Sequence, residues 1–159
     1  MKINLLVMDC DGVLTDGRLY FSARGEEMKV FDVRDGQGLV LWHKAGFKSG
    51  IISGRGGQEI IQRRADELGV EFVRANSADK VADFEAILSA LNLSHETVAY
   101  IGDDLGDIEV MKRVKFPVAV GDAVAEAKAN AAYITAALGG RGAVREVIDL
   151  LLAKNLGTP

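Results

Sequence analysis

The sequence predicts an α/β domain in which helices cover both faces of a parallel β-sheet. Short apolar runs, typical of strands buried on both faces, alternate with stretches that repeat apolar residues at the helical period. No long linker, internal repeat or low-complexity segment interrupts this alternation. The composition, with 48% hydrophobic and 26% charged residues, is that of a folded protein. We therefore expect one domain over residues 1–159, with three layers in a Rossmann-like order.

The first strand and a hairpin open the chain. Residues 3–8 form an apolar run, which predicts a buried strand. Two β-prone runs, residues 19–21 and 28–31, flank a glycine-containing turn at residues 23–26. These runs predict a β-hairpin flap that spans about residues 17–33.

Alternating helices and strands follow the hairpin. The apolar spacing predicts a helix over residues 38–44, and a buried strand at residues 49–53 comes next. An amphipathic helix at residues 58–68 is stopped by a glycine and leads to a strand at residues 70–74. Residues 79–91 repeat apolar side chains close to the helical period and form the next helix.

The C-terminal half repeats this alternation with shorter elements. The pattern predicts strands at residues 98–101, 117–120 and 133–134, and helices at residues 108–114, 123–130 and 144–152. A glycine-rich turn at residues 139–142 begins a C-terminal tail of about residues 139–159. Strands that alternate with helices in this way form a parallel sheet covered on both faces.

Charge and cysteine content exclude several classes of protein. The net charge is -4, with no long run of one sign, so we expect no nucleic-acid partner. Cys10 is the only cysteine, which excludes an internal disulfide and fits a reducing compartment. The N-terminal apolar run is too short for a signal peptide, and nothing approaches the roughly 20 apolar residues of a membrane span. We therefore expect a cytoplasmic protein that binds no membrane.

Polar residues follow the predicted strands at the points where the strands end. Ligands of open α/β sheets bind outside these carboxyl ends, so the side chains are expected to converge on one crevice. They are Asp9 and Asp11 after the first strand, Ser53, Gly54 and Arg55 after the second, Lys80 at the start of the helix after the third, and Asp103, Asp104 and Asp107 after the fourth.

This set of residues suits phosphoryl transfer. A carboxylate can attack phosphorus, but the phosphate oxygens repel its charge. Mg²⁺ held by carboxylates offsets that repulsion, and a lysine with hydrogen-bond donors holds the transferring oxygens. A second carboxyl group must protonate the leaving alcohol and later deprotonate the attacking water. Asp9 and Asp11 lie two residues apart on a turn, which suits these two roles, and Gly12 lets the backbone approach the phosphate.

The spacing of these residues resembles the haloacid dehalogenase superfamily in its phosphatase form. DCDGVLTD at residues 9–16 is similar to the first motif of that family, and SGR at residues 53–55 to the second. Lys80 is similar to the third motif, and GDDLGD at residues 102–107 to the fourth. The resemblance covers nearly the whole chain, and the first and fourth motifs together are a specific signal.

The resemblance implies a role for each position. Asp9 is expected to be the nucleophile and a magnesium ligand. Asp11 is expected to be the general acid/base and to bind Mg²⁺ through its backbone carbonyl. Asp103 is expected to be the third protein ligand of the metal, with Asp104 and Asp107 in support. The phosphate is expected to be held by Ser53 and Lys80, helped by backbone amides near Gly12 and Gly54.

The chain leaves no room for a cap domain, which most members of that superfamily carry. It therefore resembles the capless subgroup of 3-deoxy-D-manno-octulosonate 8-phosphate phosphatases. That resemblance implies an anionic sugar-acid phosphate as substrate, a step in lipopolysaccharide precursor synthesis, and a homotetramer. In such tetramers the hairpins associate and the C-terminal tails cover a neighbour's site. Arg55 fits the sugar acid, and Arg141 and Arg145 are candidates for a position near a neighbour's substrate.

The hairpin provides a separate physical reason to expect an oligomer. Leu19, Phe21, Val30 and Phe31 have no evident place in the main core, and an isolated hairpin is marginally stable in water. Pairing of hairpins between subunits would bury these side chains. It would also wall off a site that is otherwise open to water.

Several alternatives stay open. The nearest is a nonulosonate 9-phosphate phosphatase, a related enzyme that usually differs just after the Ser-Gly pair. A phospho-receiver domain also forms a phospho-aspartate, but its acceptor follows the third strand, where this chain has no suitable Asp. Asp9 and Asp11 alone could merely cap a turn. The glycine-rich segment of residues 139–142 is as compatible with an ordinary loop as with an intersubunit role.

Overall fold

A six-stranded parallel sheet forms the centre of the computed structural model, which describes residues 2–157. The strand order is β5-β4-β1-β6-β7-β8. The strands are β1 (Leu5–Met8), β4 (Lys48–Ile52), β5 (Phe72–Arg74), β6 (Val98–Gly102), β7 (Phe116–Ala119) and β8 (Tyr133–Ile134). The chain turns back at β1, which lies between β4 and β6, and at such a reversal the loops of neighbouring strands diverge and leave a crevice.

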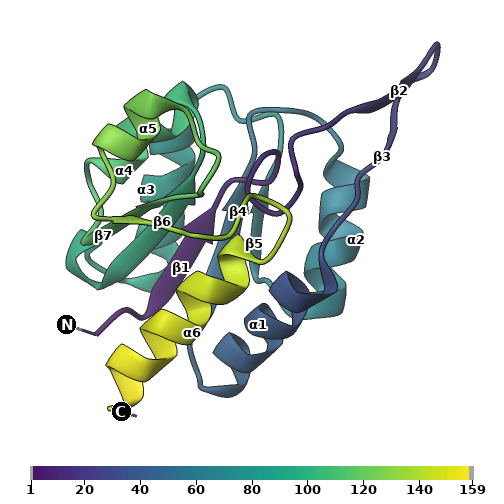
Figure 1. Cartoon of the computed structure of the whole chain (residues 1–159). Coiled ribbons are helices and arrows are strands. Elements are labelled where there is room, and N and C mark those ends of the chain that lie inside the picture. Colours follow the sequence, from purple (N-terminus) through teal and green to yellow (C-terminus); the bar gives the residue numbers. More distant parts are fainter. Residues whose placement is uncertain (1, 158–159) are drawn as a thin grey trace.

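Helices cover both faces of the sheet, as the sequence predicted (Figure 1). One layer contains α1 (Val33–Lys44), α2 (Gln58–Leu68) and α6 (Ala143–Leu156). The other contains α3 (Lys80–Leu91), α4 (Ile108–Met111) and α5 (Ala125–Ala129). The short 3-10 helices η1 (His95–Thr97) and η2 (Leu105–Asp107) lie beside β6. The predicted α/β fold class is therefore confirmed, and so is the absence of a cap, since only α2 and β5 separate β4 from α3.

The core lies on both sides of β1. All four residues of this strand are fully buried, which explains why the sequence shows an unbroken apolar run there. Trp42 of α1 and Phe84 of α3 are also fully buried, one in each helical layer. This packing fixes the ends of β1 and β6 and hence the residues that follow them. No helix in the described residues 2–157 is long and apolar enough to cross a bilayer.

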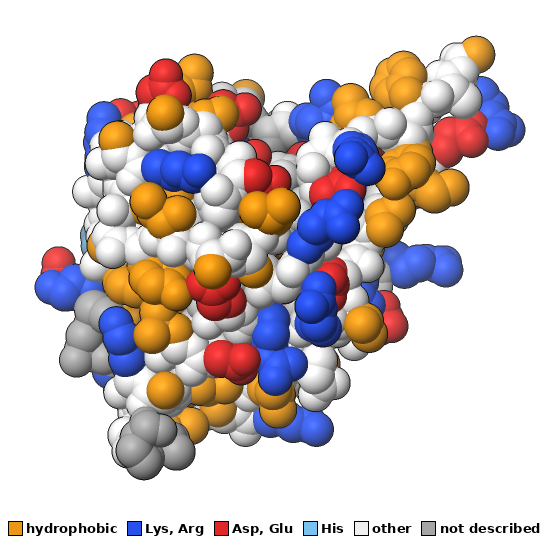
Figure 2. Space-filling model, in the orientation of Figure 1, with side chains coloured by type: hydrophobic (Ala, Val, Ile, Leu, Met, Phe, Trp, Pro, Cys, Tyr) orange, Lys and Arg blue, Asp and Glu red, His pale blue; other side chains and the backbone are white. Residues whose placement is uncertain are grey.

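The hairpin projects from the body as a separate two-stranded sheet, β2 (Tyr20–Ser22) and β3 (Gly25–Met28). Its apolar side chains gather on the projecting arm in the surface view (Figure 2). The predicted second strand, residues 28–31, was wrong. The turn is tighter than expected, so the strand begins at Gly25 and has ended before Val30.

Phe31 corrects a second expectation. It packs against the main core, and the guanidinium of Arg64 lies 5.6 Å from the centre of its ring. Leu19, Phe21 and Val30, in contrast, are exposed as predicted, at 44%, 69% and 49% of their surface. Phe31 therefore belongs to the body of the fold and leaves the hairpin with fewer unpartnered apolar residues.

Helix α1 begins at Val33, well before the predicted residues 38–44. The side chain of Asp32 caps it by accepting a hydrogen bond from the backbone N–H of Arg34. Gly36 and Gly38, which weaken the helical pattern in the sequence, are sites of close packing. A β-carbon at Gly38 would lie 3.0 Å from Cδ of Arg145 on α6.

Three other helices differ in length from the predictions of residues 108–114, 123–130 and 144–152, and α5 is shortened at both ends, to Ala125–Ala129. Helix α4 ends at Met111, and α6 continues to Leu156. The last turn of α6 is held to the start of the chain, because the side-chain amide of Asn155 donates to the carbonyl oxygen of Ile3 at 2.7 Å. It also accepts a hydrogen bond from the N–H of Ile3 at 3.0 Å. This contact between chain ends leaves no periodic signal in the sequence.

Candidate active site

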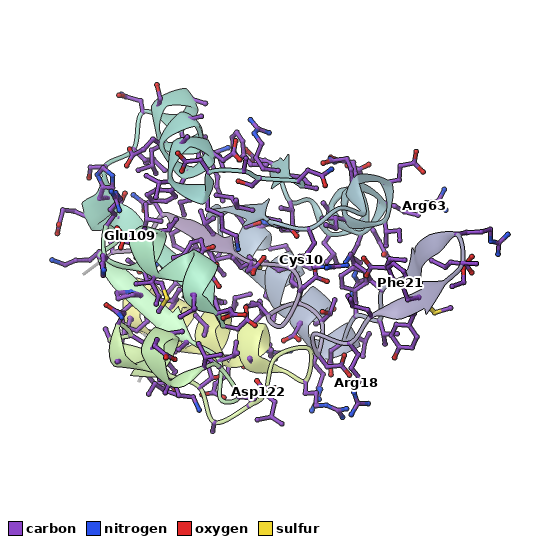
Figure 3. All side chains as sticks on the ribbon, turned by 90° about the horizontal axis from the view of Figure 1, so that it is seen from above. Cys10, Arg18, Phe21, Arg63, Glu109 and Asp122 are labelled. Atoms are coloured by element: carbon purple, nitrogen blue, oxygen red, sulfur yellow. The ribbon has the colours of Figure 1, made fainter. Side chains whose placement is uncertain are left out.

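An open cleft of about 610 Å³ lies at the carboxyl ends of the strands. Figure 3 looks down on the molecule from above, with Cys10 near the middle of the view and Phe21 on the hairpin. Residues from all four predicted groups line the cleft, together with neighbouring residues: Asp9, Asp11, Gly17, Leu19, Ser53, Gly54, Arg55, Lys80, Asp103, Asp104, Leu105 and Gly106. The predicted convergence of the strand ends is thus observed.

Asp9 follows β1 directly and is buried at the floor of the cleft. Its Oδ1 accepts a hydrogen bond from the N–H of Cys10 at 2.7 Å, and its Oδ2 lies 2.9 Å from Nζ of Lys80. Burial and the nearby charge of Asp107 raise the pKa of Asp9 to about 6, although Lys80 opposes the shift. The carboxylate is therefore fixed, desolvated and close to a cation.

Lys80 links two carboxylates of the site. It is the first residue of α3, which is capped by the side chain of Asp79, and its Nζ lies 2.8 Å from Oδ1 of Asp107 and 2.9 Å from Asp9. Burial favours a lower pKa for Lys80, but the charges of Asp107 and Asp9 outweigh it and raise the pKa. Lys80 is thus held as a cation beside Asp9, where a phosphate group would also require one.

The carboxylate of Asp103 also lines the cleft, and one of its oxygens has no hydrogen-bond partner in residues 2–157. This oxygen, Oδ1 of Asp103, is buried. A β-carbon on Gly12 would collide with its Oδ2, and Gly12 has a φ of +91°. Burial and the charges of Asp9 and Asp107 raise the pKa of Asp103 to about 8. An orphaned carboxylate oxygen of this kind fits a metal ligand.

Three carboxylates offer ligand atoms within 4.8 Å of one another: Asp9, Asp103 and Asp107. Each oxygen of Asp107 already accepts two hydrogen bonds, however, whereas each oxygen of Asp9 has a single partner. Oδ1 accepts from Lys80 and from the hydroxyl of Tyr100, and Oδ2 accepts from the backbone N–H groups of Asp103 and Asp104. Asp9 and Asp103 are therefore the side chains that fit a hard cation such as Mg²⁺, and Asp107 organises the loop around them.

Asp11 and Ser53 face each other across the cleft. Oγ of Ser53 lies 3.5 Å from Oδ2 of Asp11, at the outer limit of a hydrogen bond. The backbone of Ser53 is fixed at both ends, since its N–H donates to Arg74 and its carbonyl accepts from Ser77. A β-carbon on Gly54 would make only ordinary van der Waals contacts, so packing within the fold does not require glycine at this position.

A family model for haloacid dehalogenase-like hydrolases matches residues 59–148. The chain belongs to this family. The 3-deoxy-D-manno-octulosonate 8-phosphate phosphatase of Yersinia pestis is 43% identical to it over 151 residues, which cover 95% of this chain and 80% of the relative. Like that relative, this haloacid dehalogenase-like hydrolase is a phosphatase, so the predicted class of enzyme is confirmed.

Two solved structures are similar over almost the whole of this haloacid dehalogenase-like hydrolase. The phosphatase of Moraxella catarrhalis, in complex with magnesium, phosphate and KDO, has a TM-score of 0.93 and 36% identity, covering 98% of this chain and 88% of that one. The cobalt-bound phosphatase of Haemophilus influenzae has a TM-score of 0.93 and 33% identity, covering 97% and 90%. Together with the acidic cluster, these structures confirm the prediction of Mg²⁺ as cofactor.

The three arginines predicted near the substrate lie in different places in this hydrolase. Arg55 lines the cleft and its Nη2 is 3.8 Å from Oε2 of Glu26. Arg141 does not line the cleft and lies 3.8 Å from Asp16. Arg145 also lies outside the cleft lining and pairs with Asp149 on its own helix. Within one chain, only Arg55 is brought to the site.

The glycine-rich segment before α6 packs on the first motif of this hydrolase. The N–H of Gly140 donates to the carbonyl oxygen of Val13 at 2.8 Å, and the N–H of Gly139 donates to Asp122 at 2.9 Å. A β-carbon on Gly139 would overlap the carbonyl oxygen of Gly12. The segment therefore supports the loop that carries Asp9 and Asp11 within the same chain.

Three residues of this network were not predicted from the sequence. Tyr100 of β6 donates to Asp107 from below the site at 2.6 Å. Lys29 and Glu26 reach the site from the hairpin, where Nζ of Lys29 lies 2.7 Å from Oδ1 of Asp11. Burial favours a lower pKa for Lys29, but its hydrogen bonds to Asp11 and Glu26 outweigh that effect and raise the pKa. A lone lysine beside a hairpin carries no signal in the sequence.

Proposed function

We propose that this phosphatase hydrolyses 3-deoxy-D-manno-octulosonate 8-phosphate to the free sugar acid and inorganic phosphate, through a phospho-aspartate formed on Asp9. The observation that carries the proposal is the convergence of Asp9, Lys80 and Asp103 at the ends of β1 and β6. The relatives named for this reaction, which match 95% or more of the chain, support the choice of substrate.

In the first half-reaction, a carboxylate oxygen of Asp9 attacks phosphorus and the bond from phosphorus to the leaving alcohol oxygen breaks. Asp11 gives its proton to that oxygen, which therefore leaves as a neutral hydroxyl group of the sugar acid and not as an alkoxide. Lys80 and Ser53 hold the oxygens of the transferring group, with backbone amides near Gly12 and Gly54.

In the second half-reaction, Asp11 takes a proton from a water molecule that attacks the phosphorus of the phospho-aspartate. The bond from phosphorus to Asp9 breaks and inorganic phosphate is released, which restores both side chains. Water reaches the site easily because the cleft is open and no cap domain closes it. Asp107 and Asp104 keep the Asp103 loop in position through both steps.

The metal would be held by the carboxylates of Asp9 and Asp103 and by the backbone carbonyl of Asp11. Bound there, Mg²⁺ supplies positive charge that offsets the repulsion between the carboxylate of Asp9 and the phosphate oxygens. Oδ1 of Asp103, which accepts no hydrogen bond from residues 2–157, supports this assignment.

Arg55 supports a sugar acid as substrate, because its guanidinium can bind a carboxylate in the cleft that it lines. A nonulosonate 9-phosphate would present the same chemistry on a longer chain, so it stays the second candidate. A phospho-receiver domain is set aside by the family match. We assign the reaction to lipopolysaccharide precursor synthesis in the cytoplasm.

The test compares kcat/KM for octulosonate 8-phosphate and for nonulosonate 9-phosphate, with Mg²⁺ and after treatment with EDTA. We expect preference for the octulosonate ester and no turnover without metal. Asp9→Asn should abolish turnover and keep the melting temperature, because an amide nitrogen cannot attack phosphorus. Turnover by Asp9→Asn would exclude Asp9 as the nucleophile. A higher kcat/KM for the nonulosonate ester would show that this ester, and not the octulosonate ester, is the substrate.

We also infer a homotetramer in which the hairpins associate. The support is the exposed apolar surface of the hairpin, namely Leu19, Tyr20, Phe21, Met28 and Val30. Arg141 and Arg145 lie outside the lining of their own cleft, where each pairs with an aspartate, and we infer that they approach the site of a neighbour in the tetramer. Sedimentation velocity should give a tetramer that Phe21→Ser weakens, whereas a monomeric wild-type chain would contradict the inference.

A further inference from the structure

The side chain of Lys29 enters the site from the base of the hairpin and is almost completely buried. It is 1% exposed, and its Nζ lies between two carboxylates, 2.7 Å from Oδ1 of Asp11 and 2.9 Å from Oε1 of Glu26. A lysine is rarely buried unless its charge is paired. Both partners are themselves mostly shielded, with side chains 13% and 10% exposed. The ion pairs of Lys29 are therefore shielded from solvent, unlike the exposed ion pairs on the surface of the molecule.

The contact is fixed from several sides. The stem of Lys29 runs past Gly57 at the start of α2, where a β-carbon would lie 3.0 Å from Cε of the lysine. Glu26, the other partner, is a residue of β3 and also lies 3.8 Å from Arg55. The ammonium group therefore has little freedom to move, and it ties the base of the hairpin to the loop after β1.

The consequence for Asp11 is geometric. Lys29 binds Oδ1, which leaves Oδ2 as the oxygen directed toward Ser53, at 3.5 Å from its Oγ. Ser53 is the residue expected to hold the transferring phosphate. A carboxyl group that exchanges a proton with the leaving oxygen has to present one oxygen to that position, and free rotation of Asp11 would spoil this alignment.

We propose that Lys29 is a positioning residue that binds Oδ1 of Asp11 so that Oδ2 serves as the proton-exchanging oxygen. The inference rests on the proposed function, in which Asp11 protonates the leaving group. By this inference, the base of the hairpin orients the general acid of its own subunit through the buried ammonium group of Lys29.

The test uses two small substrates of nearly equal size, phenyl phosphate and p-nitrophenyl phosphate. Phenolate needs a proton to leave, whereas p-nitrophenolate leaves without one. Because kcat/KM reports only the steps up to the loss of the leaving group, it is insensitive to the later hydrolysis of the phospho-aspartate. In Lys29→Met, which keeps a long stem beside Gly57, we expect kcat/KM to fall about 30-fold or more for phenyl phosphate and about threefold for p-nitrophenyl phosphate.

Reference and control variants isolate the effect. Asp11→Asn should show the same discrimination between the substrates in a stronger form. Arg24→Met removes another ion pair of the same hairpin, to Glu27 at 2.6 Å, and should leave both substrates unaffected. Lys29→Arg keeps the charge in a different shape and should show a smaller version of the discrimination, which keeps the test decisive if Lys29→Met does not fold.

The outcomes separate the two levels of the argument. No turnover by the wild-type enzyme with Mg²⁺ of either aryl phosphate or of octulosonate 8-phosphate would overturn the proposed function. Discrimination in Asp11→Asn, together with equal losses for both substrates in the folded Lys29 variants, would overturn only the role of Lys29. If Asp11→Asn did not discriminate between the two substrates, Asp11 would not be the general acid. The proposed role of Lys29 would then fall as well, because that role is to position Asp11.

Discussion

The α-carbon of Gly12 faces the carboxylate of Asp103 so closely that a β-carbon at position 12 would overlap Oδ2 of Asp103. The first and fourth motifs, at residues 9–16 and 102–107, therefore meet with no space for a side chain between them. We expect Gly12→Ala to displace Asp103 and weaken Mg²⁺ binding about 10- to 100-fold, the range typical of lost support for a metal ligand. Isothermal titration with Mg²⁺ measures the change.

Gly46→Ala provides the matched control for that experiment. Gly46 has a φ of +87°, close to that of Gly12, but a β-carbon there meets nothing within 4 Å in the described structure. Both substitutions carry the same backbone strain, of about 1 kcal/mol. Equal Mg²⁺ affinity in the two variants would show that the contact between Gly12 and Asp103 is unimportant for the metal.

Lys80→Ala should reduce kcat/KM by about 100- to 1000-fold, the usual cost of removing one group that stabilises developing charge. The variant also leaves Asp9 and Asp107 without the cation that lies between them. Steady-state kinetics at saturating Mg²⁺ measures the loss. Lys115→Ala, which removes an exposed pair with Glu96, is the control and should be close to wild type. Retention of activity in Lys80→Ala would exclude a role in holding phosphate.

Tyr100→Phe should destabilise the fold by about 1 kcal/mol, because the buried Oδ1 of Asp107 loses one donor and keeps Lys80 as the other. It should also lower kcat, since Asp107 holds the loop of Asp103. Urea unfolding and kinetics measure the two effects. Tyr133→Phe removes a similar hydrogen bond, to Glu146, between two residues that do not line the cleft, and should leave kcat unchanged. An unchanged kcat in both variants would contradict the role of Tyr100.

Mg²⁺ affinity should rise with pH. The pKa of Asp9 is raised to about 6 and that of Asp103 to about 8, in both cases first by burial and then by neighbouring carboxylates. Metal ligation needs the ionised forms, so Mg²⁺ must displace protons when the pH falls below these values. The apparent Kd should therefore increase as the pH is lowered from about 9 to about 6, by up to about tenfold per pH unit for each proton displaced. Calorimetric titrations across this range, with the proton release measured in buffers of different ionisation enthalpy, test the prediction; a constant Kd contradicts it.

Cys10 should be inert in the native protein although it adjoins the nucleophile. Its side chain is fully buried, and burial together with the charge of Asp11 raises the pKa of the thiol far above neutrality. A disulfide reagent such as DTNB should label no thiol in the native protein and one thiol per chain in guanidinium chloride. Rapid labelling of the native enzyme would mean that the loop after β1 opens.

Most of the fold was predictable because its main signals are local. Residues 58–68 and 133–134 were predicted with their observed bounds, since glycine stops the helix and turn residues isolate the short strand. The start of α1 was missed, and the predicted helix began only at Gly38, because Gly36 and Gly38 weaken the helical pattern. They are required by contacts with α2 and α6 that no local pattern reveals.

The sequence alone determined the order of elements, the absence of a cap and the acidic motifs, because a buried strand and the loop that follows it are encoded by consecutive residues. Only the tertiary structure decided how these loops meet: that Oδ1 of Asp103 is left without a partner in the described residues, and that Lys29 binds Asp11. Such contacts depend on how distant elements pack and on how deeply each charged group is buried, which shifts its pKa. Neither packing nor burial is a property of any short stretch of sequence.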